Sequence, residues 1–129
     1  MANLGLYIGY MAASIGLIIV AVGIYLLVTP YHEIRLIRAG NTAAAYSLGG
    51  MVIGFAAAVA SASAHSVGMV DMVIWSAVAL AGQLLAFLAA AAVLGGFKAG
   101  MEQDKQSYGI ALGALSIAIG IVNAGALTY

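Results

Sequence analysis

The chain contains no cysteine, a single proline and little charge of either sign. Without cysteine there can be no disulfide framework, thiolate metal site, iron–sulfur cluster or cysteine nucleophile. Four basic and four acidic residues give a formal net charge of zero, so the chain has no basic field to attract nucleic acid, and we expect no nucleic-acid partner. A soluble domain carries about a quarter charged residues. At 6% charged and 65% hydrophobic residues, this chain is not suited to face water.

Groups that could perform chemistry are equally scarce. No acidic or basic residue lies deep inside an apolar run, as a buried proton-coupling residue or a voltage-sensing row of arginines would require. The two histidines, His32 and His65, fall on opposite membrane faces and cannot build a dyad or a metal site together. We therefore expect a protein that is not an enzyme and that uses no cofactor and no metal.

Four long apolar runs make up most of the sequence. Crossing about 30 Å of hydrocarbon takes about 20 helical residues, and each run is long enough. Only helices and closed barrels satisfy the backbone in lipid, and runs without strict alternation are not barrel strands. The sequence therefore predicts an all-α membrane protein with one four-span domain over residues 1–129. The predicted spans are Leu4 to Val28, Ala43 to Ala64, Val70 to Leu94, and Ser107 to Leu127.

The positions of the charges predict the orientation of the spans. All four Lys and Arg residues follow the first and third spans, so the positive-inside rule makes these connections cytoplasmic and places both termini outside. The expected cytoplasmic interface contains Glu33, Arg35, Arg38, Lys98 and Lys105, and the expected external interface contains His65, Asp71 and Trp75. Aromatic residues agree, with Tyr7, Tyr10, Trp75 and Tyr129 near the outer boundary and Tyr25, Tyr31, Tyr46, Phe97 and Tyr108 near the inner one.

The first cytoplasmic connection, from Thr29 to Gly40, has the pattern of a short interfacial helix. Thr29 is the candidate N-cap, Pro30 suits the first turn, and Gly40 is a C-terminal stop. The apolar edge of this helix would consist of Tyr31, Ile34 and Ile37. It either lies on the headgroups or forms a docking site for a cytoplasmic partner.

A shift of about 64 residues places Leu48-Gly49 on Leu112-Gly113 and Ile53 on Ile117. Each half also has the order helix, charged connection, Gly/Ala-rich helix. With two spans in each half, the two copies have the same orientation, so the sequence predicts a parallel duplication of a two-helix unit. Repeat 1 covers about residues 1–66 and repeat 2 about residues 67–129.

Glycine stripes mark the faces by which the helices could approach one another. Lipid tails are as apolar as leucine, so helices in a membrane associate through close packing, which small residues permit. The expected packing or oligomer faces contain Gly9, Gly16 and Gly23, then Gly50 and Gly54, and then Gly109, Gly113 and Gly120. Because four spans cannot bury every such face, we expect a homo-oligomer or a subunit of a larger membrane complex.

The uncharged polar residues within the spans include five candidate sites: Gln83, Asn123, Ser47, Ser61 and Ser116. A buried amide without a partner costs about 1 to 3 kcal/mol, so these groups should bond between helices. The alternative is a small channel or facilitator whose polar path is lined by Gln83, Ser47, Ser116 and Asn123. Asp71, at the start of the third span, is expected to cap that helix, with a proton or cation relay to His65 as the alternative.

Several segments together resemble the YjfL-like family. They are Glu33 to Ala45 (EIRLIRAGNTAAA), Gly49 to Phe55 (GGMVIGF), Ala60-Ser61-Ala62, Ala64-His65-Ser66, and the single residues Asp71, Trp75 and Gln83. The second copy of the Gly-Asn-Ala-Ala pattern departs from the family and reads Asp104-Lys105-Gln106-Ser107. The resemblance implies a bacterial inner-membrane protein of unknown function with four spans. By analogy with family members, it also implies an accessory role in envelope stress, but no activity.

Overall fold

The computed structural model of the protein describes residues 2 to 128, and the described residues form helices without any strand. Four helices are long and apolar enough to cross a membrane, and their bounds differ from the predicted spans by at most two residues. The predicted all-helical, four-span architecture is therefore confirmed. The helices are α1 (Ala2–Val28), α2 (Glu33–Arg38), α3 (Thr42–His65), α4 (Met69–Leu94), α5 (Phe97–Glu102) and α6 (Gln106–Ala126).

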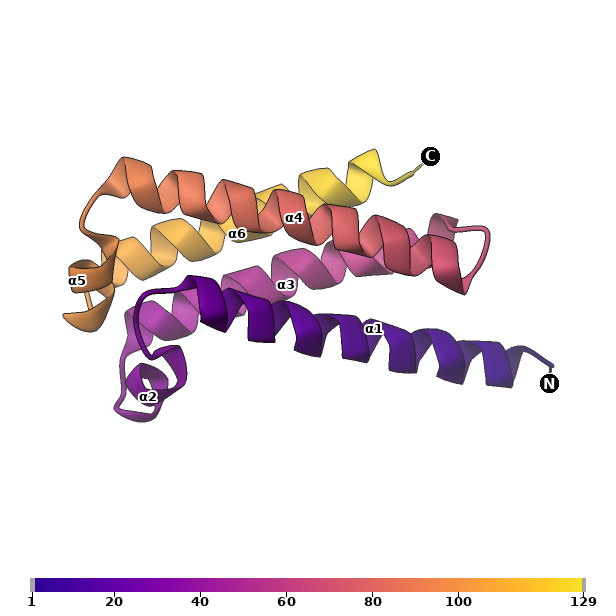
Figure 1. Ribbon diagram of the computed structural model, residues 1–129, viewed down its shortest axis with the longest axis horizontal. Helices are drawn as coiled ribbons and strands as arrows, with labels where there is room; N and C mark the ends of the chain where they lie inside the picture. The colour runs from indigo at the N-terminus through magenta and orange to yellow at the C-terminus, as the bar shows by residue number, and fades with distance from the viewer. Residues whose placement is uncertain (1, 129) are drawn as a thin grey trace.

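The two short helices lie together at one end of the bundle, and both chain termini lie at the other (Figure 1). We call the first the basic end, because it carries Arg35, Arg38, Lys98 and Lys105, and the second the terminal end. Helices α3 and α6 both run from the basic end to the terminal end, and α1 and α4 run the opposite way (Figure 1). Tyr129, expected near the outer boundary, lies outside the described residues.

Helix α3 is the centre of the bundle and contacts each of the other five helices. Half of its most apolar window is buried, whereas only 11% of the corresponding window of α1 is buried. Helix α1 packs against α3 and α4 and presents the rest of its surface outward. Helix α1 therefore has more surface available for contact with other molecules than α3 has.

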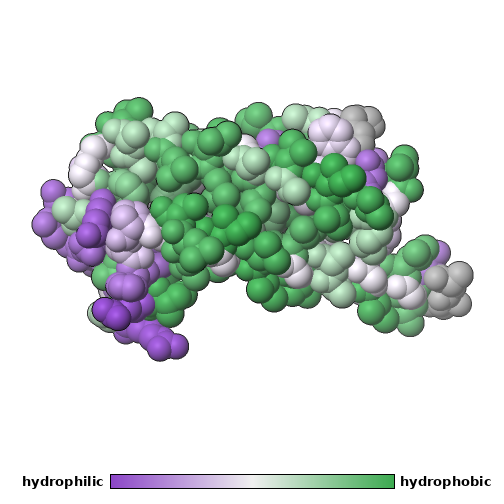
Figure 2. Space-filling view, viewed as in Figure 1, coloured by the Kyte–Doolittle hydropathy of each residue, from purple (hydrophilic) through white to green (hydrophobic). Residues whose placement is uncertain are grey.

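The outer surface of the bundle is apolar along most of its length (Figure 2). Hydrophilic residues gather over α2 and α5, with a smaller group at the terminal end. Exposed side chains between the ends include Ile15, Ile19, Ile53, Leu85 and Ile110. Such a surface is satisfied by lipid and not by water, so the chain is a multi-pass membrane protein.

The first connection differs in detail from the prediction. Its helix begins at Glu33 and not near Thr29, because α1 continues to Val28 and the Thr29 hydroxyl donates to the carbonyl of Leu26 at 3.2 Å. Gly40 does end the helix, with a φ of 91° that only glycine adopts readily. Of the expected apolar edge, Tyr31 precedes the helix, Ile34 is exposed and Ile37 is half-buried, while Glu33 is buried.

The elements of the two halves recur at a constant offset. Helices α2 and α5 have six residues each and begin at residues 33 and 97, while α3 and α6 begin at residues 42 and 106. Both pairs are therefore 64 residues apart, which is the shift found in the sequence. Even the left-handed backbone position recurs, at Gly40 and Asp104, with φ values of 91° and 56°. Helix α5 itself was not expected.

Candidate functional site

The closest contact between helices joins α3 to α6 and is made by glycine. A Cβ added to any of five glycines would collide with the backbone of the opposite helix. The colliding pairs, with the substituted glycine first, are Gly50 with Gly113, Gly54 with Ser116, Gly109 with Ala43, Gly113 with Tyr46, and Gly120 with Gly54. The contacts advance in step along both helices, so α3 and α6 pack as a parallel pair. Close backbone approach of this kind is what holds helices together in lipid.

The glycines of α1 have a different place. No described atom lies within 4 Å of a Cβ added at Gly16 or Gly23, and one added at Gly9 meets only the flexible end of Met69 among the described residues. Their seven-residue spacing puts them on one face, opposite the face that buries Ala21 and Tyr25. Within the part of the chain that the structure describes, Gly16 and Gly23 therefore face no other helix, and Gly9 touches only the Met69 side chain of α4.

The polar residues within the spans bond between helices. Gln83 of α4 donates from Nε2 to the carbonyl of Ser116 at 2.7 Å, and Asn123 of α6 donates from Nδ2 to the carbonyl of Ala79 at 3.2 Å. The Ser61 hydroxyl donates to the carbonyl of Ala124 at 2.6 Å. These bonds join α3, α4 and α6 along the length of the bundle.

Of the four residues expected to line a polar path, Gln83 and Ser116 are in contact, whereas Ser47 bonds elsewhere. Ser47 lies beside Tyr25, with 2.6 Å between the two hydroxyl oxygens, and Gln83 and Ser116 are buried in the tightly packed α4–α6 contact. The absence of a side chain at Gly54 makes the room that the Gln83 amide occupies. In this arrangement Gln83 and Ser116 hold helices together.

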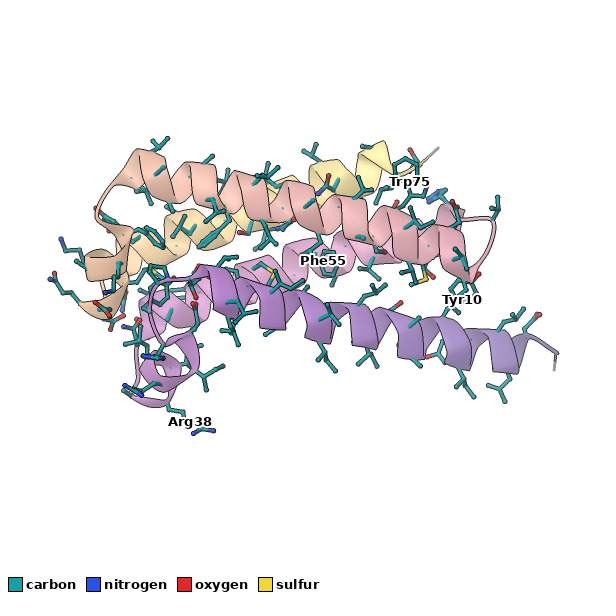
Figure 3. The ribbon with its side chains drawn as sticks, in the orientation of Figure 1. Tyr10, Arg38, Phe55 and Trp75 are labelled. Atoms are coloured by element: carbon teal, nitrogen blue, oxygen red, sulfur yellow. The ribbon has the colours of Figure 1, made fainter. Side chains whose placement is uncertain are left out.

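At the terminal end, Asp71 lies in the first turn of α4 and accepts a hydrogen bond from the backbone N–H of Val67 at 3.2 Å. A carboxylate in this place also suits the positive end of the helix dipole. His65 closes α3, with its Nδ1 3.0 Å from the carbonyl oxygen of Ser61. Tyr10 and Trp75 lie near the same end (Figure 3).

At the basic end, two side chains connect the two halves of the chain. Asn41 is the N-cap of α3: its Oδ1 accepts from the N–H of Ala44 at 2.8 Å, and its Nδ2 donates to the carbonyl of Met101 at 2.6 Å. The carboxylate of Asp104 accepts from the N–H of Ala43 and from the hydroxyl of Thr42, both at 2.9 Å. These bonds, first the one from the Ala43 N–H, lower the pKa of Asp104.

We expect Asn41→Ala to lower the free energy of unfolding by about 2 kcal/mol, since it removes both an N-cap and a buried hydrogen bond. Asn41→Ser keeps the cap but cannot reach Met101, and should recover about half of that loss. Unfolding by SDS in mixed micelles, followed by circular dichroism, measures the change. The exposed Gln103→Ala is the control. Equal stability of Asn41→Ala and Gln103→Ala would show that Asn41 does not connect the halves.

Glu33 is the residue whose position differs most from the prediction. It was expected at the headgroups, but its side chain is only 2% exposed and is the one side chain of α2 that is fully buried. The hydroxyl of Tyr25, from α1, donates to its Oε1 at 3.3 Å, and the Ser47 hydroxyl of α3 lies behind Tyr25. Its Oε2 and the buried hydroxyl of Tyr31 have no hydrogen-bond partner among residues 2–128. We call Tyr25, Tyr31, Glu33 and Ser47 the carboxyl cluster.

Burial raises the pKa of Glu33 to about 7, and the neighbouring hydroxyls of Tyr25, Tyr31 and Thr29 offset only part of that rise. Burial and the nearby charge of Glu33 likewise raise the pKa of Tyr31. Aromatic rings from α4 and α5 enclose the cluster. The ring centroids are 5.0 Å apart for Tyr25 and Phe87, and 5.9 Å apart for Tyr31 and Phe97. Tyr25 and Tyr31 are thus buried and do not anchor the chain at the headgroups.

A pocket of about 270 Å³ opens beside the carboxyl cluster at the junction of α1 and α2. Its lining includes Leu26, Tyr31, Glu33 and the exposed residues His32 and Arg35. The pocket connects the surroundings of Glu33 with the outside of the basic end. Arg38, at the end of α2, projects away from the bundle (Figure 3).

Sequence reasoning did not single out the carboxyl cluster, Asn41 or Asp104 as sites. A signal for Glu33 was present: Leu36 and Ile37 follow it by three and four residues and therefore share its face of the helix, while Arg35 and Arg38 lie on the other face. That pattern favours burial of Glu33.

Comparison with known proteins supports the resemblance found in the sequence. Residues 1–127 match the family model described as Domain of Unknown Function DUF350. The chain is 28% identical over 120 residues to the inner membrane protein YjfL of Escherichia coli strain K12, covering 93% of this chain and 91% of that protein. YjfL of Escherichia coli O157:H7 matches with the same identity and coverage. No solved structure matches the chain.

Proposed function

We propose that this chain, which belongs to the DUF350 family, is a non-enzymatic membrane protein that works by assembly, either with copies of itself or as an accessory subunit of a larger membrane complex. The observation that supports assembly most directly is the glycine stripe of α1, formed by Gly9, Gly16 and Gly23. Like the α3–α6 pair it presents glycines on one face, here seven residues apart, but no atom of another helix in residues 2–128 lies within 4 Å of a Cβ placed at Gly16 or Gly23.

Helix α1 has the largest exposed fraction of the four spans. Its buried residues Ala21 and Tyr25 lie on the face opposite Gly16 and Gly23. In lipid, a glycine face allows another helix to approach closely, and that contact supplies the packing energy that apolar side chains alone cannot. The stripe on α1 therefore suits a second α1 or a span of a partner.

The double substitution Gly16→Leu with Gly23→Leu should abolish self-association while leaving the bundle folded. A Cβ at either position has open space among the described residues, so we expect the bundle to accommodate leucine there while close approach from outside is prevented. The expected result is a shift from oligomer to monomer, measured by single-molecule photobleaching in nanodiscs or by native mass spectrometry from membranes.

Two matched substitutions make this test specific. Gly125→Leu places the same side chain in open space on α6 and should leave the oligomer intact. Gly49→Leu fills an apolar groove of about 470 Å³ between α3 and α6, which is the competing outward face. If Gly49→Leu gives monomers and the α1 double substitution does not, the interface lies on α3 and α6 and not on α1. A wild-type monomer in native membranes would contradict assembly with itself, and co-purification of no other membrane protein would then contradict the accessory role.

The proposal includes a location and a topology. The Escherichia coli relatives are named as inner membrane proteins, which supports the bacterial inner membrane. The positive-inside rule supports a cytoplasmic basic end, with α2 at the interface and both termini outside. The constant offset of 64 residues between α2 and α5, and between α3 and α6, supports a parallel duplication of a two-helix unit.

A further inference from the structure

Helix α2 contacts the bundle through one carboxyl side chain and two apolar side chains. Among the six residues of this helix, Glu33 alone is fully buried, while Leu36 and Ile37 are half-buried against the core. A helix of six residues has little stability of its own, so it holds its place through its contacts with the bundle. The state of the Glu33 side chain therefore bears directly on whether α2 stays in place.

The surroundings of Glu33 suit a neutral carboxyl better than an ionised one. An ionised carboxylate out of water needs a counter-ion or several hydrogen bonds. The groups that face Glu33 are hydroxyls: Tyr25 from α1, Tyr31 and Thr29 from the connection, and Ser47 of α3 one step behind Tyr25. From α4 and α5, the rings of Phe87 and Phe97 back the two tyrosines. The charged Arg35 and the titratable His32 line the adjoining pocket with exposed side chains.

A proton on Oε2 would complete the hydrogen bonding of the cluster. When Tyr25 donates to Oε1, the Ser47 hydroxyl must be the donor to Tyr25 across their 2.6 Å contact. This chain of donors leaves Oε2 without a partner, and within the carboxyl cluster the Tyr31 hydroxyl is the other buried oxygen that lacks one. A protonated Oε2 can donate to that hydroxyl. The pocket beside Tyr31 and His32 gives protons a route to the site.

We propose that Glu33 is a proton-binding site at the basic end, whose neutral, protonated form holds α2 against α1 and α3 and whose ionised form releases it. The ligand is a proton, and binding neutralises the one carboxyl buried among the hydroxyls of the cluster. Because the positive-inside rule assigns the basic end to the cytoplasm, the site would respond to cytoplasmic pH. The site does not depend on assembly through α1.

A spin label on α2 tests the release directly. The sequence has no cysteine, so Ala39→Cys supplies a single thiol at the exposed end of α2. In phosphatidylcholine nanodiscs, electron paramagnetic resonance should show an immobile label at low pH and a mobile one at high pH, with a midpoint near the Glu33 pKa of about 7. With Glu33→Gln, which mimics the neutral acid, the label should remain immobile at every pH.

Three further measurements separate Glu33 from other titrating groups. Glu102→Gln removes an exposed carboxyl at the same end and should leave the midpoint unchanged. His32→Gln should also leave it unchanged, and a midpoint that disappears with His32→Gln would overturn the proposal. Infrared difference spectra should show the carboxylic acid C=O band titrating with the same midpoint and vanishing in Glu33→Gln. If the label of the Glu33→Gln protein titrates like that of the wild type, Glu33 is not the proton site.

Discussion

Gly113→Ala is expected to cost the protein about 3 kcal/mol of unfolding free energy although it adds only one methyl group. The new Cβ would collide with the backbone of Tyr46, and a backbone cannot rotate away as a side chain can. The two helices must therefore separate, which loses packing along the whole α3–α6 contact. Gly120→Leu, whose side chain would enter the backbone of Gly54, should prevent folding of the bundle. Unfolding by SDS in mixed micelles, followed by the fluorescence of Trp75, the single tryptophan, measures both.

The matched control is the same change where there is open space. Gly125→Ala, on the same helix, meets no described atom within 4 Å. It should raise stability by up to about 1 kcal/mol, because alanine favours a helix over glycine. The two substitutions are thus expected to have opposite signs on one helix. Equal effects of Gly113→Ala and Gly125→Ala would mean that α3 and α6 do not touch through their backbones.

The spans were predictable because hydrophobicity over about 20 residues is a property of the sequence itself and does not depend on tertiary contacts. The end of α2 was predictable from a local signal, since Gly40 takes the positive φ that stops the helix. The choice of partners was not predictable. Glycine stripes lie on α1, α3 and α6, yet across residues 2–128 only those on α3 and α6 meet. That outcome depends on how the connections place the helices, and glycine spacing contains no information on it.

The error at Glu33 has a physical cause as well. A charged residue in a short connection is usually solvated, and the sequence near Glu33 offers no basic residue that it must pair with inside the bundle. Its burial depends on hydroxyls that come from α1 and α3, eight residues before it and 14 residues after it, at Tyr25 and Ser47. Such a set forms only when the helices pack. The prediction that no ionisable group is buried was made for the spans alone. The connections do contain one, Glu33.

The stability of the wild-type protein should fall as pH rises from about 4.5 to about 7. The ordinary pKa of the Glu33 carboxyl is 4.5, and burial raises it to about 7 in the folded protein. Between these values the folded state binds more protons than the unfolded state, so raising the pH favours unfolding. The full loss, about 3 kcal/mol, is present above pH 7 and absent below pH 4.5. Asp104 has a lowered pKa and acts in the opposite direction, but only below pH 3.8.

Glu33→Gln should remove this dependence, because the amide has no proton to lose. Near pH 5 the variant and the wild type should have similar free energies of unfolding. Near pH 8 the variant should be more stable by up to about 3 kcal/mol, an unusual gain for replacing a buried polar residue by another. Unfolding measured at a series of pH values, with Glu102→Gln as the carboxyl control, tests this. A Glu33→Gln curve parallel to that of the wild type would show that the buried carboxyl stays ionised throughout. In that case the hydroxyls of Tyr25 and Tyr31, and not a proton, would compensate for its charge.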